Sequence, residues 1–222
     1  MATKNFPSTI LLVLSTLFAF TSFGQNNKDT TTSISSSIED DNFNKMMEYS
    51  RPGKYHQLLG DLVGSWKFTG SHFEWVDSVT NKVAVELFGT AVRKSFANGR
   101  FFIVEATTGG KIQLPIQDGK MVEGNGKAIQ TEGYNNVKKK FQMSYINNHI
   151  GSEIWNFEGN YDSTTRTITF EGETEFVPGM KKKNRFLFIF IDKDHYKWEF
   201  EEEYNGKYRK ASEMNFTRVI GK

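Results

Sequence analysis

The chain has 222 residues, a formal net charge of +2 at pH 7 and no cysteine. The near-neutral charge gives no support to nucleic acid or an anionic membrane as the main partner, so no nucleic-acid binding is expected. The lack of cysteine excludes disulfides, zinc–thiolate sites, thiol catalysis and the lipid-modified cysteine of a bacterial lipoprotein. The 20 Phe, 8 Tyr and 4 Trp favour β-strands over helices.

Residues 1–24 have the three parts of a secretory signal peptide. Lys4 gives a short positive region, and residues 10–20 form an apolar run. Ser22 and Gly24 are the small residues expected just before the cleavage site. The apolar run is shorter than the roughly 20 residues that a membrane-spanning helix needs. We therefore expect an exported protein, periplasmic or extracellular, that is not a lipoprotein and keeps no membrane anchor after cleavage.

Two segments without strand character come next. Residues 25–37 are polar and rich in Ser and Thr, and they predict a flexible tether because they have too little apolar surface to fold. Residues 38–63 predict one or two short helices, with Ser37 as an N-cap and a break at "RPG" (51–53). We expect this helical segment to cap the domain that follows.

After Val63 the hydrophobic pattern changes to a period of two. Tyr196, Trp198 and Phe200, for example, alternate with charged residues. Ten such runs follow at hairpin spacing, with turn residues and no helical segment between them. A ten-strand antiparallel meander exposes two edges unless it closes, so we predict an all-β, up-and-down barrel over residues 64–220. The expected strands are 64–76, 82–96, 99–109, 124–135, 138–147, 151–162, 165–176, 184–192, 195–204 and 207–219.

Several motifs resemble those of the bacterial family called domain of unknown function 1579. They are "MMEYSRPGKYHQLLGDLVGSW", "NGRFFIVE", "EGNGKAIQTEGYNNVKKKF", "EGNYDSTTRTITFEGE" and "MNFTR", spread over about residues 46–220. The resemblance implies a lipocalin-like barrel, but the family has no agreed activity. The departures from its pattern are Asn98 for a glycine, Asn135 for an aspartate and Phe141 for a tyrosine.

The same resemblance implies a structural role for "GSW" (64–66). In lipocalin-like barrels a G-x-W motif on the first strand plugs the closed end, which gives Gly64 and Trp66 to the barrel floor. Arg218 is the matching basic residue from the last strand, because ten antiparallel strands bring the end of the tenth beside the start of the first. A cation–π contact between the two side chains contributes about 0.5–2 kcal/mol.

The four histidines are His56, His72, His149 and His195, and none has the H-x-H or H-x-x-x-H spacing of a metal site. We therefore predict no metal site and no cofactor. His56 lies on the expected capping helix, where a bond to a nearby carbonyl or carboxylate is the simplest interpretation. A haem held through His149 or His195 is an alternative hypothesis with less support.

The candidate ligand-lumen residues are aromatic, with one carboxylate among them. Glu105 lies in "FFIVEATTG", where "FFIV" hides the alternation, so both directions of its side chain stay open. Pointing inward, it would be a lumen carboxylate with a raised pKa; pointing outward, a solvated side chain. Tyr134, Tyr145, Trp155 and Trp198 either line the same lumen or fill the barrel core.

Three functions remain as hypotheses, and a binding role is favoured over an enzymatic one. The first is an exported barrel of uncharacterised function that binds a small hydrophobic or amphipathic molecule in its lumen. The second is a lyase or isomerase that uses Glu105 and a lumen tyrosine as acid and base. The third is a protein-interaction module that uses the outer face of "FLFIFI" (186–191), unless the chain's own helix or tether covers it. The sequence does not indicate an oligomeric state.

Overall fold

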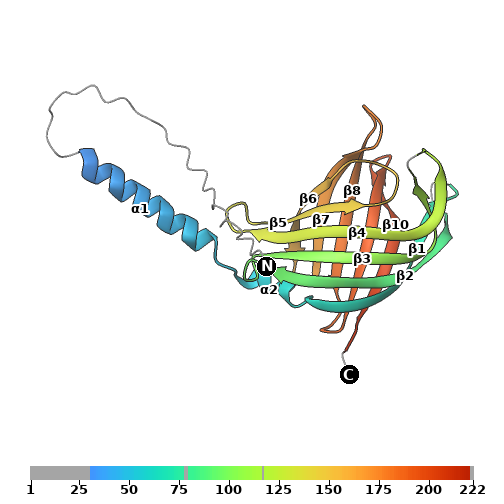
Figure 1. Cartoon of the computed structure of the whole chain (residues 1–222), viewed down its shortest axis with the longest axis horizontal. Helices are drawn as coiled ribbons and strands as arrows, with labels where there is room; N and C mark the ends of the chain where they lie inside the picture. Colours follow the sequence, from blue (N-terminus) through green and yellow to red (C-terminus); the bar gives the residue numbers. More distant parts are fainter. Residues whose placement is uncertain (1–30, 78–79, 117, 221–222) are drawn as a thin grey trace, which may run out of the picture. The chain divides into compact units, whose positions relative to one another are not determined.

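A computed structural model describes residues 31–77, 80–116 and 118–220 of the chain (Figure 1). The expected signal peptide over residues 1–24 lies outside these ranges, as does the start of the expected tether. Within the ranges that are described, no helix is long and apolar enough to cross a membrane.

Helix α1 (Thr31–Tyr49) begins inside the segment that the sequence predicts as a flexible tether (25–37). Ser37, the expected N-cap, therefore lies within the helix. Ser and Thr disfavour a helix by only about half a kcal/mol per residue relative to Ala, so a helix formed by later residues can extend back into them. The chain divides into two compact units, Met1–Phe43 and Asn44–Lys222, and the second contains the barrel.

The ten strands form one closed antiparallel barrel (Figure 1). Each strand pairs with the next in sequence and β1 pairs with β10, so the sheet has no free edge. This confirms the predicted all-β, up-and-down, lipocalin-like fold. The strands are β1 (Gly64–Trp75), β2 (Asn81–Phe96), β3 (Phe101–Pro115), β4 (Met121–Asn135), β5 (Lys140–Asn147), β6 (Trp155–Asp162), β7 (Thr167–Glu175), β8 (Lys181–Phe190), β9 (His195–Tyr204) and β10 (Lys207–Arg218).

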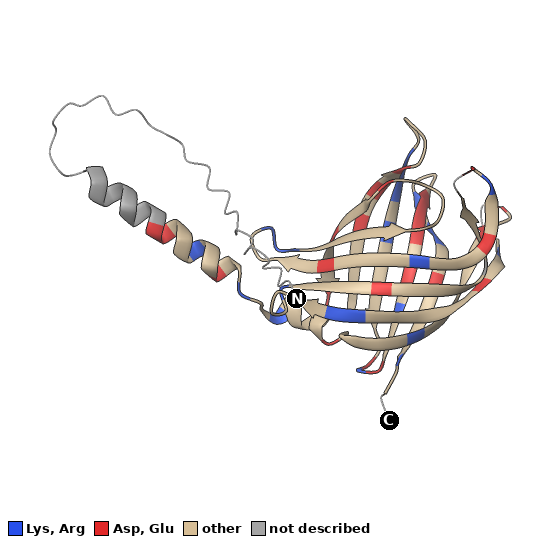
Figure 2. Ribbon diagram, viewed as in Figure 1, with Lys and Arg blue, Asp and Glu red and all other residues tan. Residues whose placement is uncertain are grey.

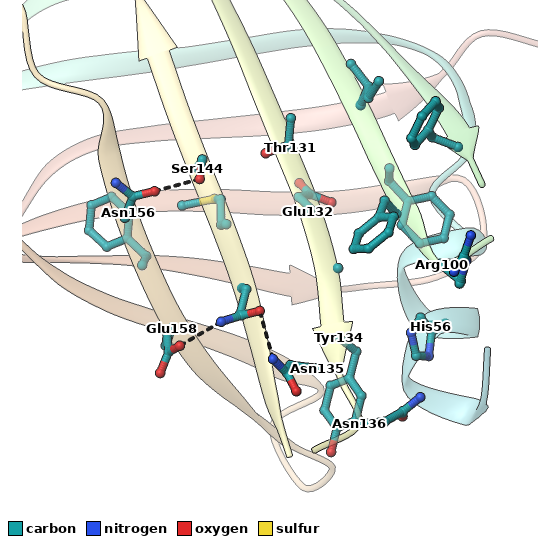
Figure 3. Close-up of a pocket in the computed structure, with 18 of the residues that line it drawn as sticks. His56, Arg100, Thr131, Glu132, Tyr134, Asn135, Asn136, Ser144, Asn156 and Glu158 are labelled. Atoms are coloured by element: carbon teal, nitrogen blue, oxygen red, sulfur yellow. Dashed lines mark hydrogen bonds between the residues drawn. The ribbon is translucent and has the colours of Figure 1, made fainter. Parts of the chain in front are cut away.

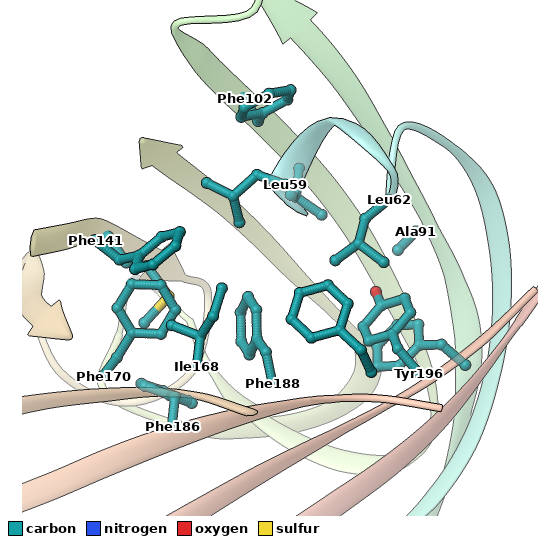
Figure 4. Close-up of a cluster of buried hydrophobic side chains, with 14 of the residues drawn as sticks. Leu59, Leu62, Ala91, Phe102, Phe141, Ile168, Phe170, Phe186, Phe188 and Tyr196 are labelled. Carbon is teal, nitrogen blue, oxygen red and sulfur yellow. The ribbon is translucent and has the colours of Figure 1, made fainter. Parts of the chain in front are cut away.

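Much of the buried core lies at the end of the barrel that helix α2 (Lys54–Gly60) covers (Figure 4). Leu59 of α2 is completely buried, and Leu62, just after the helix, is nearly so. They meet inward-facing aromatic side chains from the barrel, among them Phe102 and Tyr196. The apolar face of the predicted capping segment is thus what closes this end, since burying it removes apolar surface from water.

The floor of the barrel joins β1 to β10 through Trp66 and Arg218, which are opposite each other in the strand register. The Arg218 guanidinium lies 4.3 Å from the centre of the Trp66 ring. The Trp66 indole N–H donates to the Leu62 carbonyl at 2.9 Å. Gly64 has a φ of +136°, and a β-carbon there would lie 2.9 Å from Arg218 Nη1. The position needs glycine both for its backbone conformation and for the room that Arg218 takes.

The outer face of β8 is only partly apolar. Leu187 and Ile189 point outward and are half-buried, while Phe186 and Phe188 point into the core. In the register, Leu187 is opposite Glu199 of β9, and Ile189 is opposite Lys197. Helix α2 packs against β3 and β4, so neighbouring side chains of the sheet are what partly shield this strand.

Charged residues of both signs are interspersed along the barrel strands (Figure 2). On β9 and β10, Lys197 and Lys210 each contact both Glu199 and Glu213, at 2.7–2.8 Å. This four-residue network bridges two strands on the outer face, and its side chains are partly buried, so water screens these ion pairs less than it screens fully exposed ones.

Candidate ligand-binding site

A cavity of about 440 Å³ opens at the end of the barrel opposite to α2; we call it the mouth cavity. One wall carries aromatic side chains from strands β6, β8 and β9, namely Trp155, Phe186, Trp198 and Phe200. The rings of Trp155 and Phe200 are stacked, with centroids 5.7 Å apart, and the Phe186 and Trp198 centroids are 4.8 Å apart. Such a wall suits an apolar ring or chain.

The lining of the mouth cavity also carries polar groups. His72 Nδ1 lies 2.9 Å from Ser212 Oγ. A β-carbon on Gly126 would fall 2.9 Å from His149 Nε2, so this imidazole lies directly over β4. Burial lowers the pKa of His149, and the neighbouring His72 lowers it further. Burial raises the pKa of Tyr145 to about 12. At neutral pH the cavity therefore holds a neutral His149 and a neutral phenol.

A smaller cavity of about 60 Å³, which we call the deep cavity, adjoins the mouth cavity. The two share lining residues, including Tyr145 and Trp198. Arg93 and Gln130 line the deep cavity. Arg93 is 2% exposed and forms an ion pair with the fully buried Glu132 carboxylate, whose other oxygen accepts from Gln130. Buried charges require such pairing, because desolvation of a lone charge is costly.

A third hollow, of about 740 Å³, lies on the outer surface of strands β3 to β6 near α2 (Figure 3). Its polar side chains bond to one another: Ser144 Oγ donates to Asn156 at 2.6 Å and Gln142 Nε2 donates to Glu158 at 2.7 Å. This hollow, which we call the outer groove, is larger than the mouth cavity. These polar side chains are already paired with one another on the surface, however. The enclosed aromatic wall makes the mouth cavity the stronger candidate site.

The structure separates the five candidate lumen residues. Tyr145, Trp155 and Trp198 line the mouth cavity together. Tyr134 faces inward at the α2 end, with its ring 4.6 Å from Tyr55, and so belongs to the floor packing and not to the mouth.

The fifth candidate, Glu105, points to the outside of the barrel. Its side chain is 58% exposed and lies 3.4 Å from Lys94 Nζ. The interpretation of Glu105 as a lumen carboxylate is therefore wrong, and the lyase or isomerase hypothesis loses its acid–base group. The reason is that Phe101 and Ile103 also point outward, so the apolar run gave no alternation to follow.

The remaining histidines have structural surroundings. His56 Nδ1 accepts from the Gly53 N–H at 3.1 Å, at the start of α2. Burial lowers the pKa of His56, and a bond to the Tyr134 backbone partly opposes this. His195 lies at the closed end of the barrel, 2.9 Å from Asp192, and does not line the mouth cavity. Among the described residues, no group of three or more His, Asp or Glu is arranged to hold a metal.

Sequence reasoning missed the buried charges of the deep cavity. In "AIQTEGY" (128–134), Gln130 and Glu132 face inward while Ile129 faces outward and is 46% exposed. The polar and apolar positions are thus inverted relative to the usual pattern, and alternation alone assigns them to the wrong face. Tyr134 is the signal that could have found them. Its aromatic ring is expected to face inward, and Glu132, two residues earlier on the same strand, must share that face.

The family model "Protein of unknown function (DUF1579)" matches residues 51–218 of the chain. The chain belongs to the DUF1579 family. The match confirms the resemblance seen in the sequence motifs, and it covers α2 together with the whole barrel. The floor and both cavities of this DUF1579 protein therefore lie within the family domain.

Solved structures that resemble this DUF1579 protein include the S-type phycobiliprotein lyase CPES from Guillardia theta. The likeness covers 79% of this chain and 98% of that one, at 10% sequence identity and a TM-score of 0.43. At that identity it transfers no activity. No curated protein matches the chain significantly.

Proposed function

We propose that this protein is an exported barrel that binds one small apolar or amphipathic molecule in its mouth cavity. The observation that carries the proposal is the cavity itself, about 440 Å³, lined by aromatic side chains together with a few polar ones. Small-molecule sites have volumes of roughly 300–1,000 Å³ and combine apolar walls with a few placed polar groups. Export is supported by residues 1–24, which resemble a signal peptide. Edman sequencing of the protein from the producing cell tests export, because it shows whether these residues have been removed.

Binding is tested with N-phenyl-1-naphthylamine, a neutral fluorescent molecule that brightens in apolar surroundings. We expect saturable binding by the wild type and weaker binding by Trp155→Ala, because Trp155 contributes to the aromatic wall. Phe101→Ala is the matched control, since Phe101 is an exposed aromatic residue of the outer groove. It should leave the affinity unchanged.

Two results would count against the proposal. If N-phenyl-1-naphthylamine does not bind, and native mass spectrometry of protein from its own host finds an empty barrel, the mouth cavity is not a ligand site. If Phe101→Ala weakens binding and Trp155→Ala does not, the ligand lies in the outer groove instead.

A further inference from the structure

The deep cavity contains a donor without a partner. Among the residues that the structure describes, Arg93 Nε is a buried nitrogen with no hydrogen-bond partner. Its guanidinium is otherwise engaged, since Nη1 pairs with Glu132. A buried N–H that is left unpaired is costly, and such atoms call for an explanation such as a bound molecule.

Arg93 lines the deep cavity, which has space for a small chemical group. Its volume of about 60 Å³ exceeds the roughly 10–15 Å³ that a cavity needs to hold one water molecule. It adjoins the mouth cavity, so a ligand that fills the mouth can place one end there. That end would meet Arg93 among mostly apolar walls, which include Phe68 and Phe188.

The local charges decide which chemical group fits. Glu132 already neutralises Arg93, and Gln130 bonds to the same carboxylate. Tyr196 lies against Arg93, and burial raises the pKa of this phenol to about 12, so it is uncharged at neutral pH. A ligand carboxylate would add an unpaired negative charge to a neutral buried set, and desolvation strongly opposes this. A carbonyl oxygen accepts the free N–H without adding charge.

We infer that the ligand carries a neutral carbonyl-type oxygen at the end that enters first, and that the Arg93 Nε–H in the deep cavity binds it. The inference rests on the proposed function, because the apolar remainder of the ligand occupies the mouth cavity. It assigns an orientation as well as a class: an apolar ketone, aldehyde or ester, with the oxygen inward and the hydrocarbon toward the mouth.

Three molecules of similar length separate the possibilities: decan-2-one, decane and decanoate, each displacing N-phenyl-1-naphthylamine. For the wild type we expect decan-2-one to bind about tenfold more tightly than decane, as a hydrogen bond to a charged donor provides. Decanoate gains nothing from the deep cavity and binds no more tightly than the ketone.

The matched variant is Arg93→Met together with Glu132→Gln, which removes both buried charges and keeps similar volumes. We expect it to bind decane as the wild type does, while the ketone loses its advantage and the affinity for decanoate does not change. Arg93→Met together with Glu132→Met also removes both charges and leaves no N–H donor on either side chain, so it provides the same test if the first double variant does not fold.

The outcomes separate the inference from the proposed function. Should decanoate bind more tightly than the ketone and lose affinity in these variants, Arg93 binds a carboxylate and the inference is overturned. A ketone advantage that persists in both variants also overturns it, because the oxygen then lies elsewhere in the barrel. If neither decane nor N-phenyl-1-naphthylamine binds the wild type, the proposed function itself fails.

Discussion

The two ends of this barrel use aromatic side chains in different ways. At the α2 end, Trp66 is 1% exposed, its N–H is bonded and its ring packs against Tyr196 at 4.8 Å. At the mouth, Trp155 and Trp198 line a cavity and are only partly buried. The first arrangement favours stability because close packing leaves no space, while the second leaves room for a ligand. Substitutions at the two ends should therefore affect different properties.

The largest effect is expected from Trp66→Ala at the closed end. Removing this buried indole leaves a cavity in the floor and should lower the free energy of unfolding by about 3–5 kcal/mol. Urea denaturation measures the loss. The affinity for N-phenyl-1-naphthylamine at low temperature, where the variant is still folded, should match that of the wild type. A fall in affinity with little loss of stability would reverse the assignment of the two ends.

Arg218→Ala should be the next most destabilising change. The guanidinium donates to the carbonyls of Val63 at 2.7 Å and Asp61 at 2.6 Å, and it also covers Trp66. Losing these charge-assisted bonds should cost about 2–3 kcal/mol in urea denaturation. Arg218→Lys is the control, because it keeps the charge without the fork of donors and should be intermediate. If the Lys and Ala variants have the same free energy of unfolding, the charge that lysine keeps does not stabilise the floor.

At the mouth, Trp198→Ala should affect binding more than folding. We expect the dissociation constant for N-phenyl-1-naphthylamine to rise about tenfold, which corresponds to about 1.4 kcal/mol. Trp75→Ala is the matched control, since Trp75 has Arg209 over its ring at 5.0 Å and does not line the mouth cavity. Equal effects of the two variants on affinity would contradict the assignment of the aromatic wall.

The sequence predicts the closed end better than the mouth. The strand count places the end of the tenth strand beside the start of the first, and the family resemblance singles out Arg218 there as the residue that meets Trp66. The mouth depends on which face each strand turns inward. Glu105 and Glu132 show the difficulty. Glu105 is exposed, but it follows an apolar run that masks the alternation, whereas Glu132 is fully buried in a run where the alternation of polar and apolar residues is inverted.

The histidines that line the mouth cavity should make binding depend on pH. Burial and the nearby His72 lower the pKa of His149, so the folded protein favours the neutral imidazole. An apolar ligand buries it further, so affinity should be roughly two- to fivefold lower at pH 5.5 than at pH 7.5, with the fall beginning below about 6.5 as pH approaches the lowered pKa of His149 in the free protein. A His149→Gln variant should give a flatter profile in the same fluorescence titration. A steeper profile in that variant would contradict the assignment.

Folding stability should depend on pH in the same direction. A histidine whose folded pKa is lowered contributes stability that is present above the unfolded pKa and is lost as pH falls below it. His56 has a lowered pKa as well, so His149→Gln should remove only part of the acid sensitivity. Urea denaturation at pH 7.5 and 5.5 measures both contributions. A variant as acid-sensitive as the wild type would show that His149 does not contribute.

The smallest effect is expected from Glu105→Gln. The Glu105 carboxylate is on the outer surface, and its partner Lys94 is 60% exposed at 3.4 Å, so water and salt screen the pair. The change should alter stability by less than about 0.5 kcal/mol and leave the affinity for N-phenyl-1-naphthylamine unchanged. Arg93→Met with Glu132→Gln is the informative contrast, because it alters a carboxylate inside the same barrel. If Glu105→Gln instead abolished binding, the ligand would have to contact the outer face of β3, and the mouth cavity could not be its site.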